Sequence, residues 1–483
     1  MLTYSFENRG KESLYTWLYR CMKDDILSGK LVSGEKLPSK RSFARQLGVS
    51  TLTVENAYAL LQTEGYVSSL PKKGYYVADI PPAFHRSQPG AVSAPDSVAV
   101  SFEQPEEQQF FADFSSNQTR KENFPFSVWT KLIRRVMTEQ GENLLKNSPG
   151  GGILPLREAI AEQLREFRDM QVSPEQIIVG AGTEYLYGLL IQLLGLDSVY
   201  AVENPGYQKI WKIYQAHGVA CRYIDLDRSG MQPELLKVSG ANVIHISPSH
   251  HFPTGITMPI SRRHELLAWA SEEEERYIIE DDYDSEFRLS GKPVPTLQSI
   301  DQNGRVIYIN TFTKSLASTI RISYMVLPAS LLARYRERLD FYSCTVSNFE
   351  QYTLAAFIRE GHYEKHINRM RNNCRKKRNL LLDAIARSPL SALVSISEED
   401  AGLHFLMHVR TNLTDEELMS RAAEKGIRLT GLSYYFRGGE GQSRSAHTFV
   451  VNYSNIDENR IEEAVERLYQ ALHFSVDEAA LSC

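Results

Sequence analysis

Three short stretches of the sequence carry residue types whose order could do chemistry. Residues 180–184 read Gly-Ala-Gly-Thr-Glu, after a β-rich run and before a helical pattern, and the free N–H groups of such a turn bind anions. Asp281 and Asp282 end another β-rich run, where α/β sheets hold their ligands. Lys314 follows a third run, with Arg321 a few residues further on. These stretches offer a phosphate site, a carboxylate and a nucleophilic amine.

Together these groups meet the needs of pyridoxal 5'-phosphate. A lysine amine forms a Schiff base with its aldehyde, a carboxylate keeps its pyridine nitrogen protonated, and a turn with an arginine holds its phosphate. Each residue alone has a plainer explanation: Lys314 as a solvated loop lysine, Asp281 as a cap and Arg321 as half of a surface ion pair. The turn is not a dinucleotide fingerprint, because Tyr185 stands where the third glycine belongs. A single phosphate is therefore predicted there.

The elements that must position these residues follow from hydrophobic periodicity. Short β-rich runs alternate with helical patterns over about residues 150–330, which predicts βαβ units around a buried parallel sheet. The runs are residues 176–179, 199–202, 243–246, 277–280 and 306–309. Later, long charged helices such as 363–386 prevail, with a few strands. We expect a large α/β lobe followed by a smaller α+β lobe.

The composition is that of an ordinary globular chain. Of its 483 residues, 42% are hydrophobic and 23% are charged, which excludes disordered, collagen-like and coiled-coil classes. The longest nearly apolar stretch, 185–196, is shorter than the roughly 20 residues that span a bilayer, and the N-terminus lacks the apolar run of a secretion signal. The five cysteines have no paired spacing. We expect a cytoplasmic protein with no membrane helix.

The charge is divided unevenly along the chain. Residues 1–80 hold eleven Lys or Arg and eight Asp or Glu, which gives a net charge of +3. Because the whole chain has a net charge of −5, the remaining residues carry −8. A small basic head on an acidic body favours a polyanion-binding module. A proline-rich stretch without apolar period separates them, as in linkers. The predicted parts are a head of residues 1–79, a linker of 80–109 and a body of 110–483, with lobes of about 150–330 and 331–483.

The head has the pattern of a winged helix-turn-helix. Apolar residues at helical spacing predict two helices, the second opened by Ser39. A tight turn at Gly48 leads to Ser50, which can cap a third helix over residues 51–63. This arrangement places a recognition helix in the major groove of DNA. The basic tip at residues 72–74, between two short strands, has the features of a wing.

This head resembles the GntR-type winged helix. The match consists of a P-S-x-R start, an L-x-V-S turn, a T-V-x-x-A-Y helix and an E-G-Y segment before the wing, all in the family's order. Thr51 stands where many such domains have arginine. The resemblance implies double-stranded DNA as the partner, with Lys, Arg and Ser side chains on phosphates and Thr and Asn side chains in the groove. The residues assigned to DNA are Ser39, Lys40, Arg41, Ser50, Thr51, Thr53, Asn56, Lys72, Lys73 and Gly74.

The body resembles fold-type I aminotransferases. The matching stretches are residues 149–157, 180–184, 203–207, 252–255, 281–283 and 311–314. A GntR-type head joined to such a body is the architecture of the MocR/GabR family of bacterial transcription regulators, and the chain is identified as a member. The resemblance implies a multidomain fold: an α+β winged helix-turn-helix, then an α/β fold-type I aminotransferase-like domain that binds pyridoxal phosphate and ends in an α+β lobe.

The resemblance also assigns roles around the cofactor. Lys314 would carry the Schiff base, Tyr207 would stack on the ring, and Tyr283 would donate a hydrogen bond to the ring hydroxyl. Asp281 would bind the pyridine nitrogen, with Asp282 as an open alternative. The residues expected around the phosphate are Gly182, Thr183, Thr311, Thr313 and Arg321. Phe252 replaces the asparagine of the N-P-T-G motif, so one cofactor contact is missing and at most weak or partial transamination is expected.

An effector is expected beside the cofactor. Family members that sense 4-aminobutyrate have an arginine two residues after the stacking tyrosine, where this chain has Lys209, a point charge rather than a bidentate fork. Arg444 is the candidate for a carboxylate-binding arginine. The predicted effector is an amino compound, or pyridoxal phosphate itself if the target is vitamin B6 synthesis. His362 and His366 have i, i+4 spacing without an evident third ligand, so no metal site is predicted.

These residues are compatible with two functions of different classes. The first is a DNA-binding transcriptional regulator whose body binds pyridoxal phosphate and senses a small molecule. The second is an active aminotransferase with an accessory DNA-binding head. The basic wing and the recognition helix favour the regulator, whereas Lys314 and Asp281 fit both. The resemblance further implies a homodimer in which each head reaches the body of the other subunit.

Overall fold

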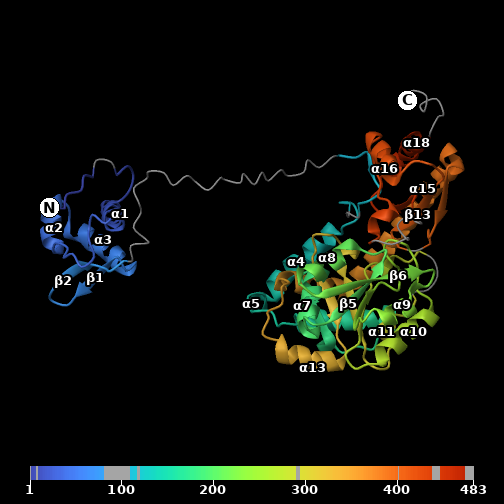
Figure 1. Ribbon diagram of the computed structural model, residues 1–483, viewed down its shortest axis with the longest axis horizontal. Coiled ribbons are helices and arrows are strands. Elements are labelled where there is room, and N and C mark those ends of the chain that lie inside the picture. Colours follow the sequence, from blue (N-terminus) through green and yellow to red (C-terminus); the bar gives the residue numbers. More distant parts are fainter. Residues whose placement is uncertain are drawn as a thin grey trace. The chain divides into compact units, whose positions relative to one another are not determined.

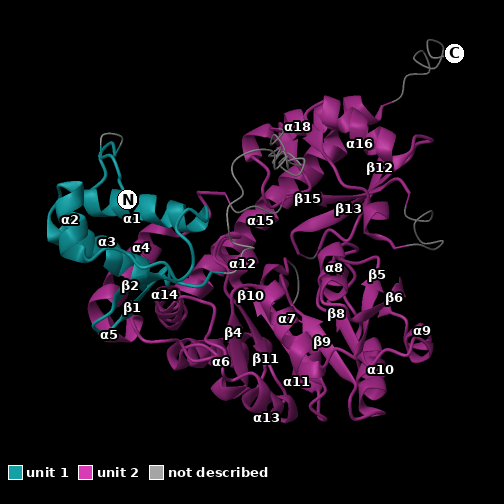
Figure 2. Cartoon of the chain, turned by 60° about the vertical axis from the view of Figure 1, so that its left-hand side comes forward, with its two compact units in different colours: residues 1–106 teal, residues 107–483 magenta. Residues whose placement is uncertain are grey.

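The computed structural model describes residues 2–6, 9–80, 109–116, 120–289, 294–400, 402–437 and 446–473. The chain forms two compact units, residues 1–106 and 107–483 (Figure 2). The boundary between the units falls within residues 80–109, which the sequence predicts to be a linker. Residues 81–108 of that stretch lie outside the described residues.

The smaller unit consists of three helices and a two-stranded hairpin. Its elements are α1 (Leu14–Leu27), α2 (Lys40–Leu47), α3 (Thr51–Thr63), β1 (Val67–Leu70) and β2 (Gly74–Val77). Ser39 and Ser50 cap α2 and α3, because their side chains accept hydrogen bonds from backbone N–H groups of the first turn. Gly48 ends α2 with a φ of 69°, a left-handed conformation that favours glycine. The winged helix-turn-helix predicted for this segment is confirmed.

One apolar core joins the elements of this unit. It contains Leu18 and Met22 of α1, Phe43 of α2, and Val54 and Tyr58 of α3, all of them buried. Burying such a side chain stabilises the fold by roughly 1.5–3 kcal/mol. Because the periodic apolar residues of α3 face this core, the opposite face of the helix is left to solvent.

The larger unit, coloured cyan to red in Figure 1, is built around an eight-stranded sheet with the order β4-β11-β10-β9-β8-β5-β6-β7. Its strands are β4 (Ile177–Gly180), β5 (Val199–Asn204), β6 (Ala220–Asp227), β7 (Gly230–Met231), β8 (Val243–Ile246), β9 (Tyr277–Asp281), β10 (Val306–Thr311) and β11 (Ser323–Val326). Strands β10, β9, β8, β5 and β6 run parallel. Every residue of β8, β9 and β10 is buried, so these strands read as nearly continuous apolar runs.

The sheet is mixed, which differs from the expected parallel sheet. β11 runs antiparallel to both β10 and β4, and β7 runs antiparallel to β6. The connection from β10 to β11 covers only residues 312–322, whereas a parallel crossover needs about a dozen residues or more. An apolar run shows where a strand lies but not its direction. The short segment between β10 and β11 contains Lys314 and keeps it near the end of β10.

Helices cover both faces of the sheet. They are α4 (Phe126–Glu139), α5 (Gly141–Leu144), α6 (Leu154–Arg168), α7 (Thr183–Leu194), α8 (Gln208–Ala216), α9 (Pro233–Val238), α10 (Ile260–Ser271), α11 (Leu297–Ile300), α12 (Phe312–Ser315), α13 (Ala329–Arg338) and α14 (Asn348–Arg359). The side chains of β10 alternate between two apolar clusters. Ile307 and Ile309 pack in the cluster that includes α7, α8 and α13, and Tyr308 packs in the one that includes α6 and α14.

The C-terminal lobe is a three-stranded antiparallel sheet covered by helices. Its strands are β12 (Val394–Ser397), β13 (His404–Val409) and β15 (Thr448–Asn452), and its helices are α15 (His362–Arg387), α16 (Asp415–Glu424) and α18 (Ile461–Leu472). β3 (Ala112–Asp113), at the start of the unit, pairs with β14 (Ile427–Arg428). Phe114 then joins Phe405 and Leu468 in the core of this lobe. The first residues of the body therefore complete its last lobe.

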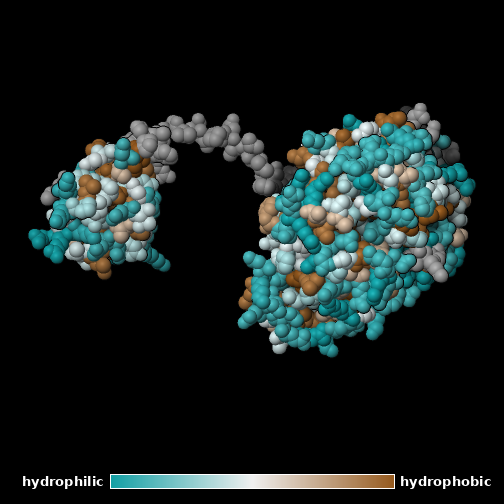
Figure 3. Space-filling model, turned by 90° about the horizontal axis from the view of Figure 1, so that it is seen from below, coloured by the Kyte–Doolittle hydropathy of each residue, from teal (hydrophilic) through white to brown (hydrophobic). Residues whose placement is uncertain are grey.

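The surface of the larger unit is mostly hydrophilic on the face in Figure 3, with separate hydrophobic patches. The longest described helix, α15, carries Lys and Arg along much of its length. Within the described ranges, none of the helices combines the length and the apolar character needed to cross a membrane.

Candidate cofactor and DNA-binding sites

Lys314 lies in α12, the single turn that follows β10. The strand ends at Thr311, whose side chain accepts a hydrogen bond of 3.1 Å from the N–H of Thr313 and so caps the turn. Lys314 lines a cavity of about 420 Å³. Burial lowers the pKa of Lys314 below its usual range, against the raising effects of Asp284 and Asp281. A lysine with a lowered pKa supplies more of the neutral amine that attacks an aldehyde.

Asp281 is the last residue of β9 and lines the same cavity. Its Oδ2 accepts a hydrogen bond of 2.6 Å from Tyr187 Oη, and His245 Nε2 lies 3.5 Å from that oxygen. Its Oδ1 is buried and has no hydrogen-bond partner in the described part of the chain. A buried acceptor without a donor is costly, and a protonated pyridine nitrogen would supply that donor. The carboxylate therefore fits the expected partner of the cofactor ring.

The turn at Gly182 lies at the edge of the cavity. α7 begins at Thr183, and no side chain among the described residues caps its first turn, so backbone N–H groups are open to an anion. Gly182 has a φ of 92°, and a Cβ there would lie 2.5 Å from Arg321 Nη2. Glycine is needed both for the turn and for the close guanidinium. Gly182, Thr183, Thr313 and Arg321 all line the cavity, as do Thr311 and Lys314.

Aromatic side chains line part of the cavity. Tyr207 precedes α8 and packs edge to face on Phe252, with ring centroids 5.9 Å apart. Tyr283 also lines the cavity. Burial, followed by the charges of Asp284 and Asp281, raises the pKa of Tyr283 well above its usual value. Its hydroxyl stays protonated and can donate a hydrogen bond, whereas Phe252 offers none.

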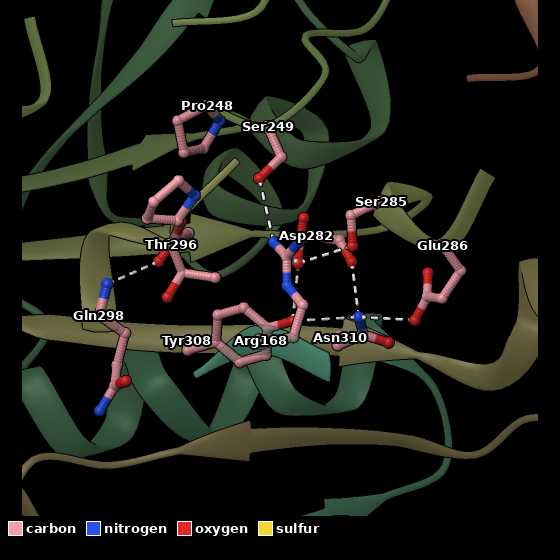
Figure 4. Close-up of polar contacts among 12 residues, drawn as sticks. Arg168, Pro248, Ser249, Asp282, Ser285, Glu286, Thr296, Gln298, Tyr308 and Asn310 are labelled. Carbon is pink, nitrogen blue, oxygen red and sulfur yellow. Dashed lines mark hydrogen bonds and ion pairs between the residues drawn. The ribbon is translucent and has the colours of Figure 1, made fainter. Parts of the chain in front are cut away.

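Asp282 takes part in a buried polar network instead (Figure 4). Its Oδ2 accepts hydrogen bonds from Arg168 Nη2 at 2.6 Å, Tyr308 Oη at 2.7 Å and Ser285 Oγ at 2.8 Å. It does not line the cavity, whereas Asp281 does. Successive residues of an extended segment point to opposite sides. This geometry favours Asp281 over Asp282 as partner of the ring nitrogen, a choice that the sequence leaves open.

The residues expected to bind an effector differ in their surroundings. Lys209 lines the cavity, but its ammonium group forms an ion pair with Glu184, which also lies 3.3 Å from Arg321 Nη2. Both side chains are about half exposed, so this is a solvent-screened ion pair at the mouth of the cavity. Arg444 lies outside the described residues. Arg437, which the sequence analysis did not single out, lines the cavity with its guanidinium carbon 4.0 Å from the centre of a Trp211 ring.

The histidine pair of α15 has other partners. His366 is buried, and its Nε2 lies 2.7 Å from the carbonyl oxygen of Ser315. His362 lies 3.5 Å from a carboxylate oxygen of Glu360. Within the described ranges, no group of three or more His, Cys, Asp or Glu side chains is placed to hold a metal ion.

Several cavity residues were missed by the sequence analysis. Tyr187 and His245 contact Asp281, and Glu203 accepts a hydrogen bond of 2.9 Å from the N–H of Ser247. Burial raises the pKa of Glu203 to about 8. Further lining residues of this kind are Phe114, Asn204, Trp211, Ser318, Tyr435, Arg437 and Asn452. A polar residue inside the apolar run of β8 could have revealed His245. Residues from distant segments, such as Asn452, leave no local pattern.

The smaller unit exposes much of the predicted DNA-binding set. Thr51 and Asn56 are exposed on α3, and Lys72 and Lys73 are exposed at the turn between β1 and β2. Lys40 differs, because its Nζ lies 2.6 Å from Glu55 of α3 and 5.5 Å from the centre of the Tyr75 ring. It links α2, α3 and the hairpin, and a phosphate contact from Lys40 requires exchange of this ion pair.

Two family models match most of the chain. Residues 14–77 match the bacterial regulatory proteins of the gntR family, and residues 111–468 match aminotransferase class I and II. Fold and cavity thus define a DNA-binding transcriptional regulator with an aminotransferase-like domain, whose cofactor is pyridoxal 5'-phosphate. More particularly, the chain belongs to the MocR/GabR family of bacterial transcription regulators.

Similar proteins cover nearly the whole chain. It is 38% identical to the HTH-type transcriptional regulator YdeL of Bacillus subtilis, over 95% of this chain and 96% of that protein. It is 31% identical to the probable rhizopine catabolism regulatory protein MocR of Rhizobium meliloti, over 95% and 93%. It is 29% identical to the pyridoxine biosynthesis transcriptional regulator PdxR of Corynebacterium glutamicum, over 95% and 96%. Pyrococcus horikoshii kynurenine aminotransferase shares the body's fold, with a TM-score of 0.65 and 24% identity over 78% of this chain and 93% of its own.

Proposed function

We propose that the chain binds pyridoxal phosphate in this cavity as a Schiff base on Lys314, and that the state of the site controls binding of the head to an operator. The bound cofactor supplies an electrophilic ring system that reacts with amines. The observation that supports this most strongly is Asp281, with one oxygen held by Tyr187 and the other buried and open in the cavity that Lys314 lines. Since its operator lies on bacterial DNA, the proposal places the chain in the cytoplasm.

The other cavity residues receive the roles implied by the family. Gly182, Thr183, Thr311, Thr313 and Arg321 hold the phosphate. Tyr207 packs on the ring and Tyr283 donates to its hydroxyl oxygen. An amino compound, or pyridoxal phosphate itself, acts as the effector, and Lys209 and Arg444 bind its anionic group. The ion pair of Lys209 with Glu184 must then loosen when the effector binds.

We also propose a homodimer in which each head reaches the body of the other subunit. Leu145 and Phe341 are 82% and 76% exposed, although both are large and apolar. Their segments are neighbours, because the N–H of Cys344 donates to the carbonyl oxygen of Ser148. Exposed apolar patches of this kind mark protein interfaces. In a dimer, two heads read two half-sites of one operator.

Cofactor binding is tested by visible absorbance after addition of pyridoxal phosphate to cofactor-free protein. The wild-type chain should gain an absorption band of a protein-bound Schiff base, and Lys314→Ala should not. Lys212→Ala removes an exposed lysine of α8 and serves as the matched control that keeps the band. A band of wild-type intensity in Lys314→Ala rejects the proposal. Steady multiple turnovers with an amino donor and a keto acceptor would support the aminotransferase function instead.

A further inference from the structure

One side chain in the first turn of α3 is large, apolar and open to solvent. Leu52 is 64% exposed, and among the described residues it is not part of the apolar core of the smaller unit. A single exposed leucine on a protein surface needs no explanation by itself. The place of Leu52 on the helix is what makes it informative.

Leu52 lies in the middle of the outward face of α3. The face of the helix that packs on the core consists of Val54, Ala57, Tyr58 and Leu61. Leu52, Asn56 and Ala59 follow one another at i, i+4 and i+7, and all three are exposed. Because the helix has 3.6 residues per turn, this row lies opposite the buried face. We call these three residues the outward row.

The start of α3 fixes the orientation of this row. The side chain of Ser50 accepts a hydrogen bond of 3.1 Å from the N–H of Thr53, so the helix begins at Thr51 and Leu52 is its second residue. In a helix-turn-helix, the N-terminal residues of the second helix contact base edges in the major groove. Leu52 therefore stands at a position from which a base edge is within reach.

The charge pattern of α3 narrows what the outward row can read. Residues 51–63 contain no Lys or Arg, the side chains that make the commonest specific contact, which is to guanine. Their one acidic residue, Glu55, forms an ion pair with Lys40 of α2, with Nζ and Oε1 2.6 Å apart. The outward row therefore presents only uncharged groups, namely an isobutyl group, an amide and a methyl group.

We propose that Leu52 is a specificity-determining residue that packs on the C5 methyl group of a thymine in the major groove of the operator. This methyl group is the apolar feature that base edges present in the major groove. The amide of Asn56, one turn further along the outward row, has the donor and acceptor that adenine N7 and N6 require. The row thus reads A·T pairs. The inference rests on the operator binding in the proposed function.

The test uses DNA from the gene's own upstream region, amplified with either dTTP or dUTP. Uracil pairs as thymine does and lacks only the C5 methyl group. Fluorescence anisotropy with the full-length chain gives a Kd for each DNA, and their ratio is the uracil penalty. We expect the wild type to bind uracil DNA at least about 4-fold more weakly for each head bound, the value of one buried methyl group.

Leu52→Ala should weaken binding to thymine DNA by about the same factor, and its uracil penalty should be smaller than that of the wild type by that factor. Leu60→Ala is the matched control, because Leu60 is a 37% exposed leucine of the same helix outside the outward row. It should keep the wild-type penalty. Since Leu52 is exposed, alanine should leave the head folded, and thermal unfolding checks this.

An equal uracil penalty in wild type and Leu52→Ala overturns the inference, because the penalty then comes from DNA shape or from other contacts. Equal binding of both DNAs by the wild type overturns it as well. A changed oligomeric state of Leu52→Ala with a wild-type penalty would assign Leu52 to a protein interface and also overturns it. If the wild type binds the upstream DNA no more tightly than unrelated DNA of equal length, the operator binding on which the inference rests is itself refuted, which separates the two failures.

Discussion

Gly182→Ala probes the phosphate corner of the cavity. The new Cβ would lie 2.5 Å from Arg321 Nη2 and 3.0 Å from its Cζ, so the guanidinium must move away. The backbone of Gly182, at φ 92° and ψ 161°, is a region that only glycine adopts readily. The substitution therefore has a backbone cost and a separate cost to anion binding.

The two costs have different magnitudes and different readouts. Forcing alanine into that backbone conformation costs about 1–3 kcal/mol of folding stability. Loss of a hydrogen bond between arginine and phosphate costs about 1.5–3 kcal/mol of binding, which corresponds to a roughly 10- to 100-fold weaker affinity. We therefore expect a lower unfolding temperature and, independently, a Kd for pyridoxal phosphate raised by that factor.

Gly195→Ala provides the matched control at the other end of α7. Gly195 has a φ of 100° and a ψ of 148°, similar to Gly182, but no described atom lies within 4 Å of the Cβ position. The Gly195→Ala variant should lose a comparable amount of folding stability and keep wild-type affinity for the cofactor. Absorbance titration of cofactor-free protein and thermal unfolding measure the two effects. Equal cofactor affinity in both variants would refute the role assigned to Arg321.

Other predictions concern the wing and a buried acid. Combined Lys72→Ala and Lys73→Ala substitutions should weaken DNA binding and reduce its salt slope by about two, with the cofactor band unchanged; an unaltered slope means that the wing does not touch phosphates. Burial raises the pKa of Glu203 from 4.5 to about 8, so its stabilising neutral form is fully present below the ordinary value and lost as pH rises through about 8. Glu203→Gln should remove this loss, on the order of 5 kcal/mol at most, and flatten thermal stability between about pH 4.5 and 8, the interval between the ordinary and the raised pKa. An identical pH dependence in wild type and variant would contradict the assignment.

Local sequence patterns predicted much of the fold. Residues 51–63 show helical spacing after a serine cap, and α3 has those bounds. The β-rich run at 277–280 became β9, which ends one residue later at Asp281. Lys314 and Asp281 were expected together because the carboxyl ends of parallel strands meet at one edge of a sheet. Cap chemistry and apolar runs depend on neighbouring residues, so a single sequence displays them.

Other features depend on contacts between distant segments. The direction of β11 follows from the length of its connection and from pairing with β4, which no apolar run encodes. Asp281 and Asp282 are chemically alike, and only their opposite orientations separate them. His250 lies among ordinary loop residues in the sequence. It contacts Asp284 and lies against Gly402, which belongs to another lobe. Such contacts have no local signature.

The central claim is that the cofactor site controls DNA binding by the head. It is tested most directly by fluorescence anisotropy with labelled DNA from the gene's own upstream region, using wild type and Lys314→Ala with and without pyridoxal phosphate. For the wild type, the cofactor should change operator affinity by roughly 5- to 150-fold, the usual range of coupling between sites. Lys314→Ala should show no such change. Equal wild-type affinities with and without the cofactor, at saturating occupancy of the cavity, would contradict the account.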